Sequence, residues 1–429
     1  MSNYIGPENI IQKKKEFLYP CTQHFYKKPP QIVKGEMQYL FDSEGRKYLD
    51  FFSGVSVVNC GHCNPEILKS TITQLKTLEH TSTIYLTEPI VKLAQKLSGV
   101  LPGDINHSFF CCTGSEANEG ALLLARIYTG RNGFISLSNS LHGRTYLTMS
   151  VTGLPMWRAD PKLSDCVTFV PNAYNKDKTL EVAANESLEA VQRVIDIKGS
   201  DIAALIAEPL QGNGGIITPP LWYFKKLKAM LNKNGILLII DEVQTGFART
   251  GKMFAIEHYD IIPDIMTVAK ALGNGVPISA FCTNNKIAAS FTNASASTLG
   301  GNPVAASTAV AVLDYIDKNN LTTNAKNLGI KLKEGLLKLK DKYPIIYDVR
   351  GIGLMIGVEL IKENGEPGAQ EADSILEILK DEGVFIGKNG LDRNVLAFQP
   401  PLVITEEDVA FVLNKLDLAL CKSNSQLNI

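Results

Sequence analysis

Short apolar runs alternate with amphipathic stretches through the middle of the chain. Each run has the length of a strand and is rich in β-branched or aromatic residues, whereas stretches such as 117–128 and 221–232 have apolar positions at helical spacing. This alternation predicts an α/β fold in which helices cover both faces of a mainly parallel sheet. The expected strands are 108–112, 133–137, 202–207, 236–240, 265–269 and 278–282.

The two ends of the chain have a different pattern. Residues 31–58 contain short alternating segments separated by turn signals, and strand-like segments are set among helices in the last third of the chain. We expect both ends to build one smaller α+β domain. The expected elements and boundaries are strands in 349–360, 384–386 and 395–401, linking helices at about 303–318 and 322–341, a larger domain over 66–309, and a smaller domain from 1–65 and 310–429.

The composition narrows the classes of function. The 429 residues include 43 Lys and Arg and 44 Asp and Glu, so the formal net charge is −1. No excess positive charge is present to attract nucleic acid or anionic lipid, and no apolar stretch reaches the roughly 18 residues of a spanning helix. We therefore expect a cytoplasmic protein without nucleic-acid or membrane partners. The 8 cysteines are sparse and several lie in apolar runs, so we expect no disulfide framework.

One segment has the spacing of the phosphate-binding loop of nucleotide hydrolases. Residues 246–252 carry its glycines and lysine, and residues 236–242 are similar to its acidic partner strand. However, Met253 occupies the position where the mechanism needs a hydroxyl group. The acidic strand also precedes the loop by only a few residues, although such a loop should follow its own strand and open a helix. The sequence therefore disfavours an ATPase.

Two further motifs have simpler interpretations. The C-G-H-C sequence at 60–63 has the frame of a disulfide-exchange site, but the flanking residues do not fit that role, so we interpret both cysteines as buried thiols rather than redox or metal-binding groups. Gly351, Gly353 and Gly357 miss the dinucleotide-binding spacing by one residue. They fit close strand packing better.

A stronger signal is the start of the helix that follows the first central strand. Thr113 and Glu116 have the spacing of a capping box. The backbone N–H groups of Gly114 and Ser115 would then lie free at a helix N-terminus, which is a ready anion site. Many helices begin this way without binding a phosphate, so this signal needs support from elsewhere in the chain.

Support comes from the residues that close two later buried strands. Asp241 ends one apolar run and Lys270 ends another, and ligands of open α/β sheets bind at this carboxyl edge. Lysine is seldom buried unless it is paired or chemically employed. Pyridoxal phosphate requires a lysine for a Schiff base, an anion cradle for its phosphate and a carboxylate for its ring nitrogen. All three occur here at successive sheet edges.

From about residue 30 to 420 the chain resembles the fold-type I, class III (omega-amino-acid type) pyridoxal-phosphate aminotransferases, such as alanine–glyoxylate and 4-aminobutyrate aminotransferases. The order of the motifs makes the resemblance more specific than any one motif alone. The matching motifs are TGSEANE at 113–119, SLHGRT at 140–145, AEPLQG at 207–212, DEVQTG at 241–246, the segment 263–275 around Lys270, STLGGNP at 297–303, and 349–360.

The resemblance implies a role for each residue that matches a family motif. Lys270 would bind pyridoxal 5'-phosphate as a Schiff base and act as the general base, and Asp241 would pair with the pyridine nitrogen. Burial beside the cationic cofactor would lower the pKa of the lysine. Thr298 resembles the residue that reaches the phosphate of the neighbouring subunit's cofactor, which implies a homodimer. The other expected cofactor-binding residues are Gly114, Ser115, Leu141, His142, Glu208, Val243 and Gln244.

Two positions bear on cofactor and substrate binding in particular. The family usually has an aromatic residue before His142, where this chain has Leu141, so one of these two side chains must cover that face of the cofactor ring. Arg144 matches the arginine that binds a substrate carboxylate in 4-aminobutyrate aminotransferases; the alternative is a structural ion pair at a helix start. Tyr85 is a candidate for the substrate entrance, and a packed surface aromatic is the alternative. We expect no metal.

Two family residues are missing. The 4-aminobutyrate enzymes carry a glutamate after the E-P-x-Q-G motif and an arginine near the C-terminal P-P-L segment, and together these accommodate the second carboxylate of 2-oxoglutarate. The corresponding residues here are Asn213 and Ala397, although Arg393 lies close enough in sequence to replace the arginine. Without that arginine a dicarboxylate would leave a charge poorly paired. We therefore expect an acceptor with one carboxylate, such as pyruvate or glyoxylate.

The sequence thus predicts a transaminase that works by a ping-pong mechanism. Its partners would be an amine donor, which the sequence does not name, and a small oxoacid acceptor. Two alternatives use the same lysine: a 4-aminobutyrate-type transaminase with 2-oxoglutarate as the acceptor, and an amino-acid epimerase or racemase. An ATPase belongs to a different class, and only the phosphate-loop spacing favours it.

Overall fold

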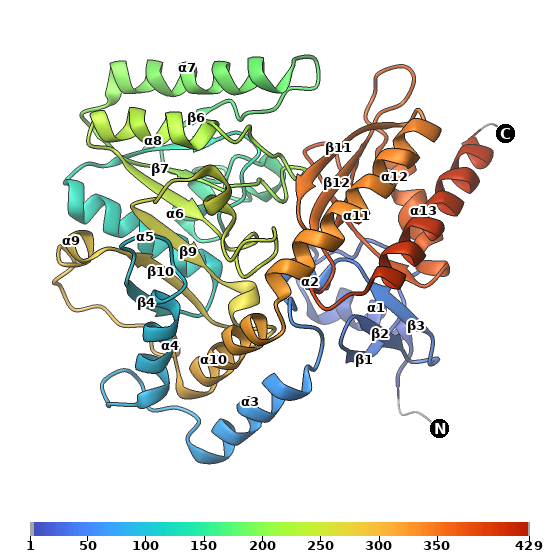
Figure 1. Ribbon diagram of the computed structural model, residues 1–429, viewed down its shortest axis with the longest axis horizontal. Coiled ribbons are helices and arrows are strands. Elements are labelled where there is room, and N and C mark those ends of the chain that lie inside the picture. Colours follow the sequence, from blue (N-terminus) through green and yellow to red (C-terminus); the bar gives the residue numbers. More distant parts are fainter. Residues whose placement is uncertain (1–3, 428–429) are drawn as a thin grey trace.

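A computed structural model describes residues 4–427 of the chain. Figure 1 shows two lobes: a larger lobe around a central sheet, and a smaller lobe that combines the two ends of the chain. The central sheet has 7 strands in the order β4-β10-β9-β8-β7-β5-β6. Its strands are β4 (His107–Cys111), β5 (Gly133–Leu137), β6 (Val167–Val170), β7 (Ile202–Ala207), β8 (Leu237–Asp241), β9 (Ile265–Val268) and β10 (Ser279–Thr283).

The expected mainly parallel sheet is confirmed. Strands β9, β8, β7, β5 and β6 are parallel neighbours, and only β10 runs antiparallel to its two neighbours, β4 and β9. The six expected strands occur within one residue of their predicted positions. Strand β6 was not expected, because its four residues lie at the edge of the sheet and are only partly buried, so they lack a long apolar run.

Helices cover both faces of this sheet. Alternate side chains of β7 enter two separate clusters: Leu205 packs with one group of helices, while Ala204 and Ile206 pack against α5 on the opposite face. This two-sided burial explains why the strand is apolar at every position. The helices of the first group are α7 (Leu180–Lys198), α8 (Tyr223–Lys233) and α10 (Pro303–Lys318), and α5 spans Gly114–Thr129.

The smaller lobe contains two sheets of 4 strands each. One sheet has the order β1-β2-β3-β13, in which β13 from the last third of the chain pairs in parallel with β3 from the first. The other sheet has the order β11-β12-β15-β14. The strands are β1 (Ile32–Glu36), β2 (Tyr39–Asp42), β3 (Lys47–Asp50), β11 (Ile346–Ile352), β12 (Met355–Leu360), β13 (Val384–Phe385), β14 (Gly387–Asn389) and β15 (Val395–Phe398).

Helices α11 (Leu321–Lys342) and α12 (Ala369–Asp381) pack on these sheets, and α13 (Glu406–Leu427) packs against both helices. The expected domain boundaries stay predictions, and the one at 309/310 falls inside α10. The remaining helices are α1 (Pro7–Phe17), α2 (Ser53–Ser56), α3 (Pro65–Thr77), α4 (Glu88–Ser98), α6 (Tyr146–Ser150), α9 (Asn285–Ala288), and the short 3-10 turns η1 (Pro155–Trp157), η2 (Ala255–Tyr259) and η3 (Lys270–Leu272).

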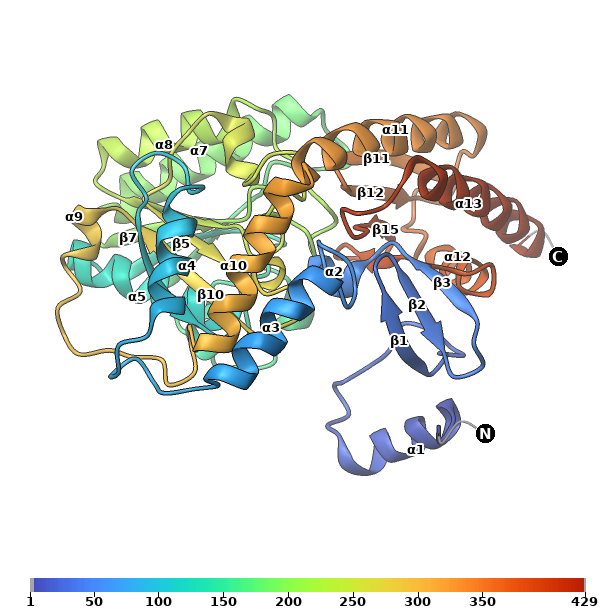
Figure 2. The same cartoon turned by 60° about the horizontal axis from the view of Figure 1, so that its bottom comes forward.

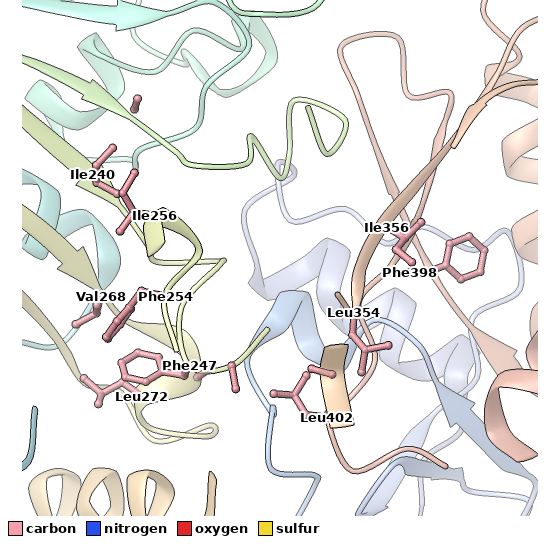
Figure 3. Packing of buried hydrophobic residues seen from close by; sticks show 14 of the residues in the cluster. Ile240, Phe247, Phe254, Ile256, Val268, Leu272, Leu354, Ile356, Phe398 and Leu402 are labelled. Carbon is pink, nitrogen blue, oxygen red and sulfur yellow. The ribbon is translucent and has the colours of Figure 1, made fainter. Parts of the chain in front are cut away.

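A continuous apolar cluster joins the two lobes. Figure 3 shows its side chains on elements of both lobes, with those of the larger lobe on the left and those of the smaller lobe on the right. Because both lobes bury side chains in one core, they pack as one body. The labelled residues are Ile240, Phe247, Phe254, Ile256, Val268 and Leu272 in the larger lobe, and Leu354, Ile356, Phe398 and Leu402 in the smaller lobe.

Helix α1 lies at the periphery of the fold. Helix α1 has no buried residues and lies apart from the body of the molecule, beside β1 and β2 (Figure 2). Within residues 4–427, no helix combines the length and the apolar character that crossing a bilayer requires. The phosphate-loop spacing at 246–252 forms turns and bends and does not open an α-helix, as a nucleotide-binding loop should.

Candidate active site

A cavity of about 380 Å³ opens where the central strands end. It lies at the carboxyl ends of β7, β8 and β9 and at the N-terminus of α5, which is the edge where open α/β sheets bind ligands. Ten of the expected site residues line it together. They are Gly114, Ser115, Leu141, His142, Arg144, Glu208, Asp241, Val243, Gln244 and Lys270.

Asp241 is the last residue of β8, and its carboxylate is 3% exposed. Oδ2 accepts a hydrogen bond from Asn118 Nδ2 at 2.7 Å and lies 2.8 Å from His142 Nδ1. Oδ1 accepts the backbone N–H of Val243 at 3.0 Å. Since a carboxylate only accepts, His142 carries its hydrogen on Nδ1 in this contact. These bonds fix the direction of the carboxylate within the cavity.

Asn118 is a site residue that the sequence analysis did not single out. It lies on α5, is 1% exposed, and donates from Nδ2 both to Asp241 and to the backbone carbonyl of His142. Its Oδ1 accepts the hydroxyl of Thr267 on β9 at 2.6 Å, which sets the orientation of the amide. The available signal was a polar residue on the buried side of an apolar helix, within the motif at 113–119.

Lys270 follows β9 by two residues and begins the short turn η3. Its backbone has φ +45°, a left-handed conformation that is uncommon for residues other than glycine. Burial lowers the pKa of Lys270 below its ordinary value, and the nearby carboxylates of Asp241 and Glu208 oppose this shift. A lysine of lowered pKa is more often neutral, which suits it for attack on a carbonyl and for proton transfer.

The helix start predicted from the sequence is present. Thr113 Oγ1 accepts the N–H of Glu116 at 3.2 Å, and the Glu116 carboxylate accepts the N–H of Thr113 at 3.0 Å, so the capping box is complete. A Cβ atom at Gly114 would lie 2.9 Å from Val243 Cγ1. Glycine therefore lets the first turn of α5 approach the end of β8 and form an anion cradle in the cavity.

Gln244 is held by shape rather than by hydrogen bonds. A Cβ atom at Gly212 would lie only 1.3 Å from Gln244 Oε1, so the absence of a side chain at 212 makes room for the glutamine. Gln244 is 6% exposed, and within residues 4–427 neither its Oε1 nor its Nε2 has a hydrogen-bond partner. A buried amide without partners is available to a ligand that can pair with it.

Glu208 joins two segments of the cavity wall. Its carboxylate accepts the backbone N–H of Leu141 at 2.9 Å and that of Gly212 at 3.0 Å. Burial raises the pKa of Glu208 to about 7, with the Asp241 carboxylate adding to the rise. His142 and the two N–H groups act in the opposite direction. Leu141 and His142 both line the cavity, and the His142 ring is held by Asp241, which leaves Leu141 free to cover a ligand.

The outer part of the cavity contains the groups expected to meet substrate. Arg144 is exposed, and within residues 4–427 its guanidinium makes no ion pair or hydrogen bond; only its backbone N–H is used, by Ser115 Oγ at 3.1 Å. Its role in carboxylate binding stays a prediction. Asn213 and Trp157 also line this part of the cavity. Trp157 was not expected, because its position in η1 carries no motif.

Two expected site residues lie elsewhere in the chain's own structure. Thr298 and Tyr85 line a second pocket of about 600 Å³, formed by the segments 80–91 and 298–303. Both residues are exposed, and Tyr85 is 64% exposed. The structure therefore groups these two residues with each other and not with Lys270.

The structure also places the two residues considered for binding a second acceptor carboxylate, Ala397 and Arg393. Ala397 on β15 is fully buried in an apolar cluster with Leu210, Ile216 and Met355. Arg393 does not line the cavity, and its guanidinium lies 5.1 Å from the centre of the Phe25 ring. The lysine and arginine side chains among the described residues of the cavity wall are Lys270 and Arg144.

The residues of this cavity fit pyridoxal phosphate. The buried Asp241 carboxylate suits a cationic ring nitrogen, the N-terminus of α5 suits a phosphate, and the unpartnered amide of Gln244 and Nε2 of His142 need polar partners. Lys270 lies in the same cavity. Within residues 4–427, no group of three or more His, Cys, Asp or Glu side chains could hold a metal ion.

Comparisons with known proteins agree with this chemistry. A family model described as aminotransferase class-III matches residues 23–420. A protein from Arabidopsis thaliana named alanine–glyoxylate aminotransferase 2 homolog 2, mitochondrial, is 41% identical over 428 residues, covering 98% of this chain and 89% of that protein. A leucine/methionine racemase from Thermococcus litoralis is 39% identical and covers 96% of this chain and 95% of that protein. The crystal structure of a transaminase from the marine bacterium Virgibacillus is similar with a TM-score of 0.90 and 32% identity, covering 98% of this chain and 100% of that chain.

Proposed function

Because this chain belongs to the class III aminotransferases, we propose that it moves an amino group from an amino acid or omega-amino acid to an oxoacid with one carboxylate, such as pyruvate or glyoxylate. The fold is that of the fold-type I enzymes, and the class depends on pyridoxal phosphate. Both predictions from the sequence are confirmed. The proposal adds the nature of the acceptor and the roles of individual residues.

Bound pyridoxal phosphate supplies an aldehyde that condenses with amines and a ring that takes up carbanion charge. The chain's own residues do the rest. Asp241 holds the proton on the ring nitrogen, because its buried carboxylate favours a cation there. Lys270 Nζ would hold the cofactor at rest, and once free it would take the proton from the substrate carbon that bears the amine and deliver it to the cofactor carbon. The lowered pKa of Lys270 keeps this amine available as a base.

Arg144 is the residue we expect to bind the substrate carboxylate. Arg144 lines the cavity, and its guanidinium makes no ion pair with residues 4–427, so its donors are free for a ligand. A guanidinium can bind a carboxylate with two parallel hydrogen bonds, which would fix the α carbon relative to Lys270. The same arginine would serve the donor and the acceptor in turn.

The observation that carries the acceptor proposal is the packing around Ala397. Leu210, Ile216 and Met355 fill the space around it, and Arg393 is held over Phe25, outside the cavity. The position of the missing glutamate is Asn213, which lines the cavity without a charge. With Arg144 engaged by the first carboxylate, a second carboxylate near the neutral amide of Asn213 would find no further arginine in the cavity wall, and burial of an unpaired charge is costly.

A racemase is the second candidate, since one relative at 39% identity carries the name leucine/methionine racemase. Both reactions begin with removal of the α proton of an amino acid, a step in which Lys270 Nζ would act as the base, but a racemase returns a proton to that carbon. They differ in whether an oxoacid product leaves. A racemase would exchange the α hydrogen of its substrate with solvent deuterium and release no oxoacid.

A half-reaction screen tests the proposal. The coloured enzyme is mixed with each candidate amine in deuterium oxide, and the loss of colour and the oxoacid product are measured. The aminated enzyme is then mixed with pyruvate, glyoxylate or 2-oxoglutarate, and the return of colour is followed. We expect pyruvate or glyoxylate to be faster than 2-oxoglutarate by at least about 10-fold. Equal rates would refute the acceptor proposal, and deuterium exchange without oxoacid would favour the racemase.

We also propose that the functional unit is a homodimer. Thr298 and Tyr85 lie together in an exposed pocket away from the chain's own Lys270, as expected for residues that complete a partner's site. The placement of the protein in the cytoplasm is a further prediction, which cell fractionation would test.

A further inference from the structure

The loop of residues 211–217 reaches the active-site cavity through Asn213. Its two ends pair with each other, because the N–H of Gln211 donates to the carbonyl of Ile217 at 3.0 Å and the reverse bond is 3.2 Å long. Asn213 lies between these ends, is half-buried and lines the cavity. The position of Asn213 therefore depends on whatever fixes this short closed loop.

Three donors of the smaller lobe bind the backbone carbonyls of this loop. Asn389 Nδ2 donates to Gly212 O at 3.0 Å, and the N–H of Gly390 donates to Asn213 O at 2.9 Å. Arg350 Nε donates to Gly215 O at 2.8 Å. The smaller lobe thus holds the loop on both sides of Asn213, whereas the residue itself faces the cavity of the larger lobe.

Arg350 is in turn held rigidly. It is 9% exposed, and its Nη1 pairs with Glu359 and with Asp348, the latter at 3.0 Å. The guanidinium also lies 4.4 Å from the centre of the Tyr174 ring, whose hydroxyl donates to the same Glu359 carboxylate. A guanidinium fixed by two carboxylates and a ring presents its remaining Nε–H in one direction. The Nε–H points to the carbonyl oxygen of Gly215.

Apolar packing anchors the underside of the loop, where one residue has an uncommon backbone conformation. Ile216 is fully buried against Met355 and Ala397 of the smaller lobe, and it has φ +54°, which costs energy for a β-branched residue. Such a conformation persists only when the surroundings hold it. The hydrogen bonds from the smaller lobe supply that restraint.

The loop also connects directly to the cofactor-binding groups. The N–H of Gly212 donates to Glu208, and Gln244 occupies the space that a side chain at 212 would take. A shift of the loop would therefore change the positions of Asn213 and Gln244 together. Nothing in the known chemistry of Lys270 or Asp241 requires Asn389 or Arg350, which do not line the cavity.

We propose that Asn389 and Arg350 are positioning residues that set the affinity of the enzyme for its amino acceptor by fixing the 211–217 loop. They act through Asn213 and do not touch the substrate. The smaller lobe thereby takes part in acceptor selection, although the reacting groups belong to the larger lobe. This inference rests on the proposed aminotransferase function and uses whichever oxoacid proves to be the best acceptor of the unmodified enzyme.

The test compares two buried asparagines of the same lobe. Asn389→Ala removes the bond to Gly212 O, whereas Asn394→Ala removes a bond of similar length, 2.9 Å, to Leu360 O, within the smaller lobe. The two side chains are 3% and 4% exposed. We expect Asn389→Ala to raise the KM for the acceptor about 3- to 10-fold with kcat changed less than about 2-fold, and Asn394→Ala to leave the KM unchanged.

Combination with Asn213→Ala shows whether Asn389 acts through that residue. In the Asn213→Ala background, Asn389→Ala should change the KM by less than about 2-fold, because coupled residues are not additive. Hydrogen exchange of the 211–217 amides in the cofactor-free protein gives a readout besides activity, and it should be faster in Asn389→Ala than in Asn394→Ala. If Asn389→Ala does not fold, Arg350→Lys replaces it, since lysine keeps the charge but lacks Nε–H.

Two results would overturn the inference. One is an equal rise in KM for Asn394→Ala and Asn389→Ala, which would indicate a general loss of packing. The other is a double variant in which the increases in KM caused by Asn389→Ala and by Asn213→Ala multiply, as they would for independent residues. Failure of the proposed function is distinguishable from both results. In that case the unmodified enzyme itself, in its aminated form, would not transfer the amino group to any oxoacid.

Discussion

The residues of the cavity divide into those that we propose bind the cofactor and those that fix them in place. Lys270 and Asp241 could be predicted because each closes an apolar strand, where a charged residue has no simple structural reason to occur. Asn118 could not be predicted. Its bonds to Asp241, the carbonyl of His142 and Thr267 join a helix to strands that are distant in sequence, and local patterns carry no information on such contacts.

Replacement of Lys270 tests the central residue. Lys270→Ala removes the amine, and alanine would take up the same left-handed backbone as lysine, so we expect a folded protein that binds pyridoxal phosphate without covalent attachment. The general-base contribution alone predicts a loss in kcat of at least about 10²- to 10⁴-fold. Borohydride reduction followed by peptide mass analysis checks the attachment: the modified peptide should contain residue 270 in the unmodified enzyme and be missing in the variant. A modified peptide elsewhere would contradict the assignment.

Glu242, the residue after Asp241, makes stability depend on pH. It is fully buried, and burial raises its pKa from 4.5 to about 7, although hydrogen bonds from Thr245 and the N–H of Ile256 oppose the shift. The folded protein therefore binds this proton more tightly than the unfolded chain. The stability that this group contributes is present below pH 4.5 and is lost as the pH rises to 7.

Glu242→Gln isolates this effect, because the amide can accept from Ile256 and donate to Thr245. We expect the variant and the unmodified protein to have similar free energies of unfolding at pH 4.5. At pH 8 the variant should be more stable by about 3 kcal/mol. Urea unfolding of both cofactor-free proteins at the two pH values measures this. A difference that does not change with pH would mean that Glu242 titrates normally.

At the scale of elements, the central strands and the helices between them followed from the apolar pattern. Strand β4, for example, lies at His107–Cys111, close to the expected 108–112, and α10 lies at Pro303–Lys318, as expected. Short elements at the edge of the fold could not be predicted from this pattern. Strand β6 exposes much of its four residues, so it lacks the apolar signal, and η1 with Trp157 is defined by the chain around it rather than by its own sequence.

The N-terminus of α5 gives a test at this scale. Gly114→Ala places a Cβ atom 2.9 Å from Val243, so the helix start or the valine must shift, and the N–H groups of the anion cradle shift with it. We expect the affinity for pyridoxal phosphate to fall by at least about 10-fold. Titration of the cofactor-free protein, followed by tryptophan fluorescence, measures the affinity.

Gly130→Ala, at the other end of the same helix, is the matched control. Gly130 has φ +68° and no atom within 4 Å of an added Cβ, so alanine there costs about 1–2 kcal/mol of stability through the backbone alone. The affinity for pyridoxal phosphate should not change. Equal losses of affinity in the two variants would show that helix stability, and not the cradle, determines cofactor binding.

The whole molecule depends on contacts between its two ends. Strand β13 adds to the sheet of β1, β2 and β3, and the apolar cluster continues from one lobe to the other (Figure 3). The sequence predicted that both ends share a domain. It could not predict which strands pair, because register across hundreds of residues depends on packing, nor that the smaller lobe holds the 211–217 loop.

The position of Thr298 gives a test of the proposed homodimer. Thr298 is exposed and lies with Tyr85 in a pocket that Lys270 does not line, so a single chain does not bring Thr298 to its own cofactor site. If Thr298 completes the site of a partner, Lys270→Ala and Thr298→Glu should each be inactive alone, the second because a carboxylate repels phosphate. A mixed dimer would nevertheless contain one site with both original residues.

Mixing these two variants after dissociation and reassembly therefore distinguishes the two arrangements. With equal amounts of each chain, about a quarter of the sites should carry both Lys270 and Thr298, and activity should recover to about that fraction of the unmodified enzyme. If Thr298 acted within its own chain, no site in the mixture would contain both residues, so no activity would return. Recovery measured against time after mixing would also report the rate at which the dimer exchanges its subunits.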